Sequence, residues 1–370
     1  MSELGINFSS VTVGEMVDRL SGAYVALLRA GKPLKSFPPV MLWGAPGIGK
    51  SQGVRAIAKR IAAETGKRVN VTDVRLLLFN PVDLRGIPTA NEDRTLAVWL
   101  KPKIFQMEEG EGTVNLLLLD EISAAPPSVQ AAAYQITLDR TVGEHKLPDN
   151  CIVLAAGNRV TDRSVAYAMP KALANRLCHL ELVNDAESWH RWAVRAGIHR
   201  IVLGFLEANP EWLMEFDPQN EDLAFPTPRS WEMVSHILGG VSENVHAMLP
   251  LIVGCVGKDA AYELFTWSEI YGSLPDVEEI FAGACPMPPQ KPNALFALSS
   301  MIVSYAWEHH ASDGIRNAVK YVYRLPHEFK NRIYKDLLEI GELRELLSNI
   351  REYDDWFARS GREWDRYGVC

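Results

Sequence analysis

The stretch 44–51 reads Gly-Ala-Pro-Gly-Ile-Gly-Lys-Ser and has the spacing of a loop that binds phosphate. It lies between a short apolar run at 39–43 and a stretch at 52–64 rich in Ala, Ile, Lys and Arg, which are the strand and the helix that such a loop requires. Glycines let backbone N–H groups approach the phosphate oxygens, because a Cβ would hold the backbone away. We expect Lys50 to reach the β- and γ-phosphates and the Ser51 hydroxyl to coordinate Mg²⁺.

Two acidic residues, Asp120 and Glu121, follow a second expected strand at 114–119. Residues 116–119 are all leucine, which indicates a strand inside a parallel sheet that is covered on both faces. Because ligands of such sheets bind at the carboxyl ends of the strands, Asp120 should lie beside the phosphate loop. We expect Asp120 to hold magnesium through water, and Glu121 to orient and partly deprotonate the water that attacks the γ-phosphate. The alternative is an ordinary acidic pair on a solvated loop before a helix.

Three residues farther along the chain have the chemistry to complete such a site. Asn158 follows a third expected strand at 151–156, where its amide would reach the γ-phosphate or the attacking water, although Gly-Asn is also a common turn. Arg176 and Arg229 are candidate partners for the negative charge that develops in the transition state. Either arginine, taken alone, is also typical of an ordinary surface residue.

Length and composition limit the class of protein. The chain has 370 residues, enough for about two or three domains, and 47% of them are hydrophobic, enough for a substantial core. The apolar runs are too short to span a bilayer and the first ten residues have no signal pattern, so we expect a soluble cytoplasmic protein. The five scattered cysteines are expected to be reduced. A net charge of −8 argues against nucleic-acid binding through an overall basic surface, although a local basic stripe stays open.

The order of the expected elements divides the chain into three parts. Residues 1–184 alternate between strands and helices and are expected to form an α/β nucleotide-binding core with a leading helix. The pattern is helical from residue 185, which predicts a helical domain at 185–284. Four prolines at 285–292 mark a linker, and a C-terminal helical region follows within 285–370.

Several shorter segments have patterns of their own. Thr12 begins a capping box ahead of the leading helix. Residues 80–95 are read as a loop with a short helix, and residues 140–150 as a hairpin. The aromatic residues of the tail either dock a partner or pack back onto the helical region: Tyr353, Trp356, Trp364 and Tyr367.

The order of the motifs resembles that of an AAA+ ATPase. Residues 44–51 correspond to its Walker A motif, 117–121 to Walker B, Asn158 to sensor 1, Arg176 to the arginine finger and Arg229 to sensor 2. The resemblance covers approximately residues 40–238. The ordered set is far more specific than any one of its members.

The finer resemblance is to the MoxR branch of that family. Residues 120–132 are similar to the branch's acid pair followed by Ala-Pro-Pro-x-x-Gln. Further similarities lie at 83–86 (Asp-Leu-Arg-Gly), 103–105 (Lys-Ile-Phe), 169–177 and 227–229 (Thr-Pro-Arg). Two positions depart from the branch, because Ala124 stands where an arginine is usual and Arg159 where a proline is usual.

The resemblance implies a P-loop NTPase fold of class α/β, with a parallel sheet flanked by helices, followed by an all-α lid and a C-terminal helical region. It implies a homo-oligomeric ring, expected to be a hexamer, in which Arg176 acts on the nucleotide of the neighbouring subunit, and an inserted hairpin at 140–150. It also suggests ATP and Mg²⁺ as cofactors and the remodelling of a client protein, one with a von Willebrand A-type domain. The residues expected to bind ATP are Gly44, Ala45, Pro46, Gly47, Ile48, Gly49, Lys50, Ser51, Gln52 and Arg229. The residues expected to act in catalysis are Lys50, Glu121, Asn158 and Arg176. The residues expected to hold Mg²⁺ are Ser51 and Asp120.

Two other functions stay open from the sequence. A switch-like module would use ATP to assemble, with little turnover, and would bind partners through its helical tail. A nucleic-acid remodeller would show salt-sensitive binding to DNA or RNA, or stimulation of its ATPase activity by either.

Overall fold

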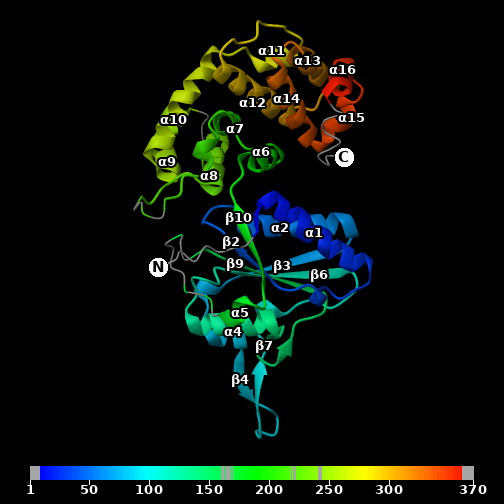
Figure 1. Ribbon diagram of the computed structural model, residues 1–370, viewed down its shortest axis with the longest axis vertical. Coiled ribbons are helices and arrows are strands. Elements are labelled where there is room, and N and C mark those ends of the chain that lie inside the picture. Colours follow the sequence, from blue (N-terminus) through cyan, green and yellow to red (C-terminus); the bar gives the residue numbers. More distant parts are fainter. Residues whose placement is uncertain are drawn as a thin grey trace. The chain divides into compact units, whose positions relative to one another are not determined.

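The computed structural model describes residues 9–159, 162, 167, 169, 171–217, 219, 222–240 and 244–360. The chain forms two compact units (Figure 1). The first comprises Met1–Asn184 and Asp217–Glu221, and the second comprises Asp185–Phe216 and Asp222–Cys370. None of the helices in these described residues has both the length and the apolar character that crossing a bilayer needs.

The first unit is built on a parallel sheet of six strands in the order β1-β10-β2-β9-β6-β3. The strands are β1 (Ser10–Thr12), β2 (Val40–Trp43), β3 (Arg68–Arg75), β6 (Thr113–Asp120), β9 (Cys151–Gly157) and β10 (Cys178–Val183). Every residue of β2, β6 and β9 is buried, as their apolar sequences indicate. Helices α1 (Val13–Arg29) and α2 (Lys50–Thr65) lie on one face, and α4 (Pro127–Leu138) and α5 (Lys171–Ala174) on the other (Figure 1). The expected α/β fold, a parallel sheet flanked by helices, is confirmed.

The register of the sheet brings three strand ends to one edge. Trp43 at the end of β2 pairs with Gly157 at the end of β9, and Leu119 near the end of β6 pairs with Ala155 of β9. Since the three strands are parallel neighbours, the segments that follow them leave the sheet side by side. Those segments are the phosphate loop, the acid pair and Asn158.

The interpretation of 80–95 as a loop with a short helix is wrong in part. The short helix is present as α3 (Pro81–Arg85), but it is followed by an antiparallel hairpin of β4 (Ile87–Ala90) and β5 (Ala97–Leu100). Nearly all of the hairpin's side chains are exposed, so its sequence lacks the alternation that a half-buried strand would show. The hairpin expected at 140–150 is present and short, with strands β7 (Thr141–Val142) and β8 (His145–Lys146).

The second unit is helical throughout its described residues. Its helices are α6 (Ala186–Arg195), α7 (Arg200–Ala208), α8 (Pro228–Gly240), α9 (Val245–Val256), α10 (Lys258–Ser268), α11 (Val277–Phe281), α12 (Pro292–Glu308), α13 (Ser312–Val322), α14 (His327–Glu339), α15 (Arg344–Leu347) and α16 (Arg351–Ser360). One continuous core joins helices from both sides of the proline-rich segment 285–292, and α12 packs against α7. The functional division of this unit into a lid (185–284) and a C-terminal region (285–370) stays a prediction.

Two of the tail aromatics are buried in this core. Tyr353 and Trp356 pack against Tyr334, with ring centroids 5.6 and 4.8 Å apart. This contact favours packing over partner docking for these two residues. The other two, Trp364 and Tyr367, lie outside the described residues.

A buried group of charged side chains lies between α6, α7 and α14. His190 Nε2 is 2.9 Å from Asp336 Oδ2 and 3.8 Å from Glu207 Oε1, and the Glu207 side chain is 1% exposed. These three residues are spaced as metal ligands would be, but the guanidinium of Arg332 also forms an ion pair with Glu207. Burial lowers the pKa of Arg332, against the nearby carboxylates that raise it. Because the arginine already supplies a positive charge, we interpret the group as a structural ion-pair network.

Replacing Glu207 by glutamine is expected to destabilise the second unit by about 2–4 kcal/mol, because the Arg332 guanidinium would lose a buried counter-charge. This expected destabilisation is smaller than that for breaking a fully buried ion pair, because the Arg332 side chain is 40% exposed. Urea-induced unfolding, followed by tryptophan fluorescence, measures the change. Glu263→Gln removes one exposed carboxylate from α10 and should leave the unfolding midpoint unchanged. A Glu207 variant as stable as the wild type would contradict the network.

Candidate functional site

The phosphate loop has the local structure that its sequence predicts. It connects β2 to α2, and α2 begins at Lys50 with Gly49 as its N-cap. Gly47 and Gly49 have φ angles of 79° and 103°, a region that residues with a Cβ rarely occupy. The loop therefore turns back on itself and presents the positive N-terminal end of α2 at the edge of the sheet.

The Lys50 ammonium group lies at the centre of the site. Lys50 Nζ donates hydrogen bonds to the carbonyl oxygens of Gly44 at 2.6 Å and Ala45 at 3.0 Å. It also donates to Oδ1 of Asn158 at 2.9 Å, although the two residues are 108 positions apart in sequence. The predicted meeting of the lysine and the amide is thus present in the structure.

The two residues expected to hold magnesium also meet. Ser51 Oγ donates a hydrogen bond to Asp120 Oδ2 at 2.7 Å, across 69 positions of sequence. The other carboxylate oxygen of Asp120 accepts from the backbone N–H of Glu121 at 2.9 Å. Asp120 is 8% exposed, so its carboxylate has little freedom to turn away from Ser51.

Glu121 lies in the turn directly after β6 and is partly exposed. Its φ angle is +58°, which is uncommon for a residue with a side chain. Its carbonyl oxygen accepts hydrogen bonds from the N–H groups of Ala124 and Ala125, which hold the turn closed. A strained backbone held in this way is frequent at functional sites, where it fixes the direction of a side chain.

Sequence reasoning missed one pair of positioning residues, Ser123 and Gly157. Ser123 Oγ accepts a hydrogen bond from the backbone N–H of Asn158 at 3.0 Å. A Cβ on Gly157 would lie 2.6 Å from the same oxygen, so the close approach of β9 to the acid-pair turn requires glycine. The signal in the sequence is the glycine immediately before Asn158, at the end of the third expected strand.

Arg159, one of the two departures from the MoxR pattern, has a structural role. Its guanidinium forms ion pairs with Asp162 at 2.9 Å and with Glu181 of β10 at 2.5 Å. Burial alone lowers the pKa of Arg159, but the hydrogen bonds that its guanidinium donates to Asp162 and Glu181 outweigh this effect, so the net shift of the pKa is upward. This arginine therefore stays charged and ties the backbone after Asn158 to β10, which is separated from β9 by β2 in the sheet.

Three further predicted site residues lie on α2, directly after α5 and on α8. Gln52 is in the first turn of α2. Arg176 follows α5, is exposed, and makes no hydrogen bond or ion pair with the described part of the chain. Arg229 is exposed in the first turn of α8, after a cap in which Thr227 Oγ1 accepts from the N–H of Ser230. Because α8 belongs to the second unit, the role of Arg229 toward a nucleotide stays a prediction.

The segment that carries the site matches known proteins in sequence. Residues 39–179 match the family described as "ATPase family associated with various cellular activities (AAA)". Over 141 residues, 37% of this chain, the identity is 29% to the chaperone MoxR1 of Mycobacterium tuberculosis and 32% to the uncharacterized protein YeaC of Bacillus subtilis. These matches cover 34% of MoxR1 and 40% of YeaC, so the chain spans only about a third to two-fifths of the length of these curated relatives.

Solved structures of similar proteins match more of the chain at lower identity. A RuvB variant of Thermotoga maritima is 15% identical, with a TM-score of 0.36 over 80% of this chain and 84% of that one. PCH-2 of C. elegans is 14% identical, with a TM-score of 0.35 over 70% of this chain and 69% of that one. The phosphate loop, the acid pair, Asn158 and Arg176 all lie within the segment that the family match covers. Residues 39–179 of this chain are therefore similar to the AAA family of ATPases, and the resemblance to its MoxR branch is confirmed.

Proposed function

We propose that this protein is a Mg²⁺-dependent ATPase that works as a homo-oligomeric ring and remodels a partner protein. The observation that carries the proposal is the meeting of residues from three distant segments: Lys50 and Ser51, Asp120, and Asn158. A lysine, a hydroxyl, a carboxylate and an amide at the mouth of a glycine-rich loop are the groups that binding and hydrolysing a nucleoside triphosphate require.

The residues present fit ATP and Mg²⁺. Mg²⁺ prefers oxygen ligands and retains several of its waters, and Ser51 Oγ and Asp120 Oδ2 offer two oxygens only 2.7 Å apart. When bound there, the ion would neutralise charge on the phosphates. Lys50 would exchange its contacts with the Gly44 and Ala45 carbonyls for the more strongly accepting phosphate oxygens.

Glu121 of the acid pair and the Asn158 amide would then have separate roles in ATP hydrolysis. The Glu121 carboxylate would orient the attacking water and take its proton, because it follows the buried Asp120 at the same edge of the sheet. The Asn158 amide, already within reach of the Lys50 ammonium, would hold the γ-phosphate or that water in line. Phosphoryl transfer requires little covalent chemistry from the protein, so these positioning contacts would account for most of the rate enhancement.

Steady-state release of inorganic phosphate tests the activity. We expect turnover with ATP and Mg²⁺, and its loss when EDTA removes the metal. Nucleotide-dependent assembly without turnover would favour the switch-like module instead. Stimulation of turnover by DNA or RNA, with steep loss of binding as salt rises, would favour a nucleic-acid remodeller.

Arg176 is proposed to complete the site of a neighbouring subunit. The guanidinium is exposed and unpaired within the described residues, as a residue that acts on another subunit would be. We expect Arg176→Ala to lose about 10³-fold in turnover. Mixing it with Lys50→Ala subunits, which keep Arg176, should restore part of the activity. Mixed rings that form but stay inactive would contradict action in trans.

The partner and the assembly are supported by the resemblance. MoxR1 bears the name of a chaperone, which supports a remodelling role for this chain. A hexameric ring, a client with a von Willebrand A-type domain and a cytoplasmic location remain proposals. Affinity capture with Glu121→Gln in the presence of ATP is the experiment that would identify clients held on the ring.

A further inference from the structure

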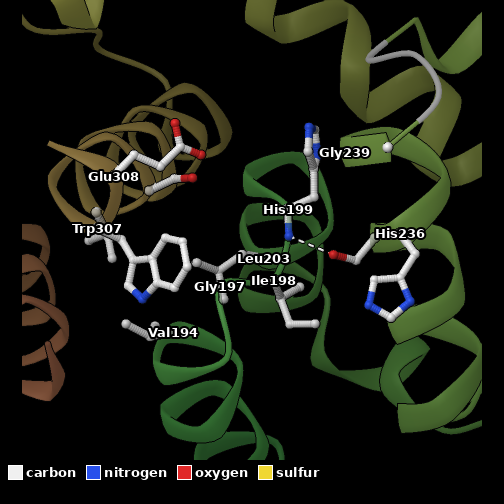
Figure 2. A pocket seen from close by; sticks show the side chains of 13 residues that line it. Val194, Gly197, Ile198, His199, Leu203, His236, Gly239, Trp307 and Glu308 are labelled. Carbon is white, nitrogen blue, oxygen red and sulfur yellow. Dashed lines mark hydrogen bonds between the residues drawn. The ribbon is translucent and has the colours of Figure 1, made fainter.

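The second unit contains a cavity of about 260 Å³ between the α6–α7 turn, α8 and the end of α12 (Figure 2). Its lining includes Trp307 and Glu308 of α12, and the two side chains lie on the same side of the cavity (Figure 2). We call it the Trp307 pocket. All of its lining residues belong to the second unit, so the nucleotide site plays no part in its construction.

The wall of the Trp307 pocket is mostly apolar, although the side chains of His199, Ser235, His236 and Ser304 also line it. Val194, Ile198 and Leu203 on the wall are each no more than 5% exposed. Trp307, in contrast, is 41% exposed. The indole lies against Gly197, where a Cβ would come within 2.9 Å of its ring atoms. Because Gly197 has a φ angle of +66°, this turn both ends α6 and leaves room for the indole.

The electrostatics of the pocket favour a cation. Glu308 is exposed and makes no ion pair with the described residues, and the lining contains no lysine or arginine. Three helices, α6, α8 and α12, end at the pocket, and each brings the negative end of its dipole.

Among the described helices whose residues line the pocket, α7 is the one that begins there and brings a positive end. His199 caps it, since its Nδ1 accepts the N–H of Ile201 at 3.3 Å, and its own N–H donates to Ser235 Oγ at 2.8 Å (Figure 2). These bonds satisfy donors that would otherwise attract an anion. The imidazoles of His199 and His236 also line the pocket, and His310 Nε2 lies 2.8 Å from the Trp307 carbonyl oxygen at the end of α12. The Glu308 carboxylate, which is unpaired within the described residues, and the C-terminal ends of α6 and α8 are therefore the groups that favour a cation.

We propose that the Trp307 pocket binds a lysine or arginine side chain on an exposed segment of a partner protein. The volume suits one long side chain and is below that of ordinary small-molecule sites. The aliphatic stem lies along Val194, Ile198 and Leu203, and the cation lies over the Trp307 ring beside the Glu308 carboxylate. The apolar stem and the charged end of such a side chain would thus each contact a surface of complementary character.

The pocket can be tested with N-acetyl-arginine methylamide and N-acetyl-lysine methylamide as probes. Protein labelled with 5-fluorotryptophan is titrated and followed by fluorine NMR, and Trp307→Phe assigns the Trp307 signal. We expect a saturable shift of that signal with Kd in the millimolar range, as for one anchored side chain. The citrulline counterpart, which has nearly the shape of arginine but no charge, should bind at least about tenfold more weakly.

Two variants distinguish binding at a specific site from the general attraction of a cationic probe to an acidic protein. Glu308→Gln is expected to weaken arginine binding about tenfold while the other indole signals stay in place. Glu263→Gln removes the same charge from the exposed face of α10 and should leave binding unchanged. The proposal is overturned by equal binding of citrulline and arginine, by equal effects of the two variants, or by a Trp307 signal that does not respond. The citrulline comparison uses the wild-type protein, so it decides the matter even where a variant misfolds.

Discussion

Replacing Glu121 by glutamine is expected to lower the rate of ATP hydrolysis by about 10²- to 10⁴-fold while ATP still binds. The amide of glutamine keeps the size of the side chain but cannot accept the proton of the attacking water. The groups proposed to hold the triphosphate are on other residues, and the hydrogen bonds of Lys50 to the Gly44 carbonyl and to Asn158 do not involve Glu121. Binding and hydrolysis should therefore separate in this variant.

Single-turnover phosphate release and equilibrium binding of ATP measure the two effects independently. Glu109→Gln is the matched control, because Glu109 is an exposed glutamate of the same unit that lies outside the site. The control should hydrolyse ATP at the wild-type rate. Wild-type turnover in Glu121→Gln would show that another group is the base, whereas loss of binding would show that Glu121 supports the loop rather than the chemistry.

The site was largely predictable because its residues follow buried strands. A run such as 116–119 has no polar residue, so the sheet, its covered faces and the place where Asp120 leaves it follow from sequence alone. Parallel strands then bring Ser51, Asp120 and Asn158 to one edge. For the same reason Lys50 and Asn158 were both expected at the γ-phosphate, whereas the direct hydrogen bond between them was not predicted.

The features that were not predicted depend on exposed or long-range contacts. The β4–β5 hairpin is exposed on both faces, so its sequence has no hydrophobic periodicity that would indicate strands. The bond from Asn158 to Ser123 joins residues 35 positions apart, and only the fold brings them together. The proline-rich segment 285–292 interrupts the helices as predicted, yet the core continues across it, because α12 returns to pack on α7.

Replacing Lys50 by alanine is expected to weaken ATP binding by about 10²- to 10³-fold, because about two charge-assisted hydrogen bonds of about 1.5–3 kcal/mol each are lost. The substitution is also expected to alter the loop before ATP binds, which would weaken binding further. In the structure, Lys50 bridges the Gly44 and Ala45 carbonyls to Asn158. Without the ammonium group, these acceptors lose their common donor, and the loop loses part of the geometry that receives phosphate.

Isothermal titration with ATP and Mg²⁺ measures the loss, and Lys59→Ala provides the matched control, because Lys59 is an exposed lysine on the same helix, α2. The control removes the same charge and side chain without touching the loop, so its affinity should stay close to that of the wild type. An equal loss in both variants would mean that the net charge of the unit, and not the position of Lys50, attracts the nucleotide. Wild-type affinity in Lys50→Ala would remove the central cation from the proposed site, and with it the assignment of the loop as the phosphate-binding element.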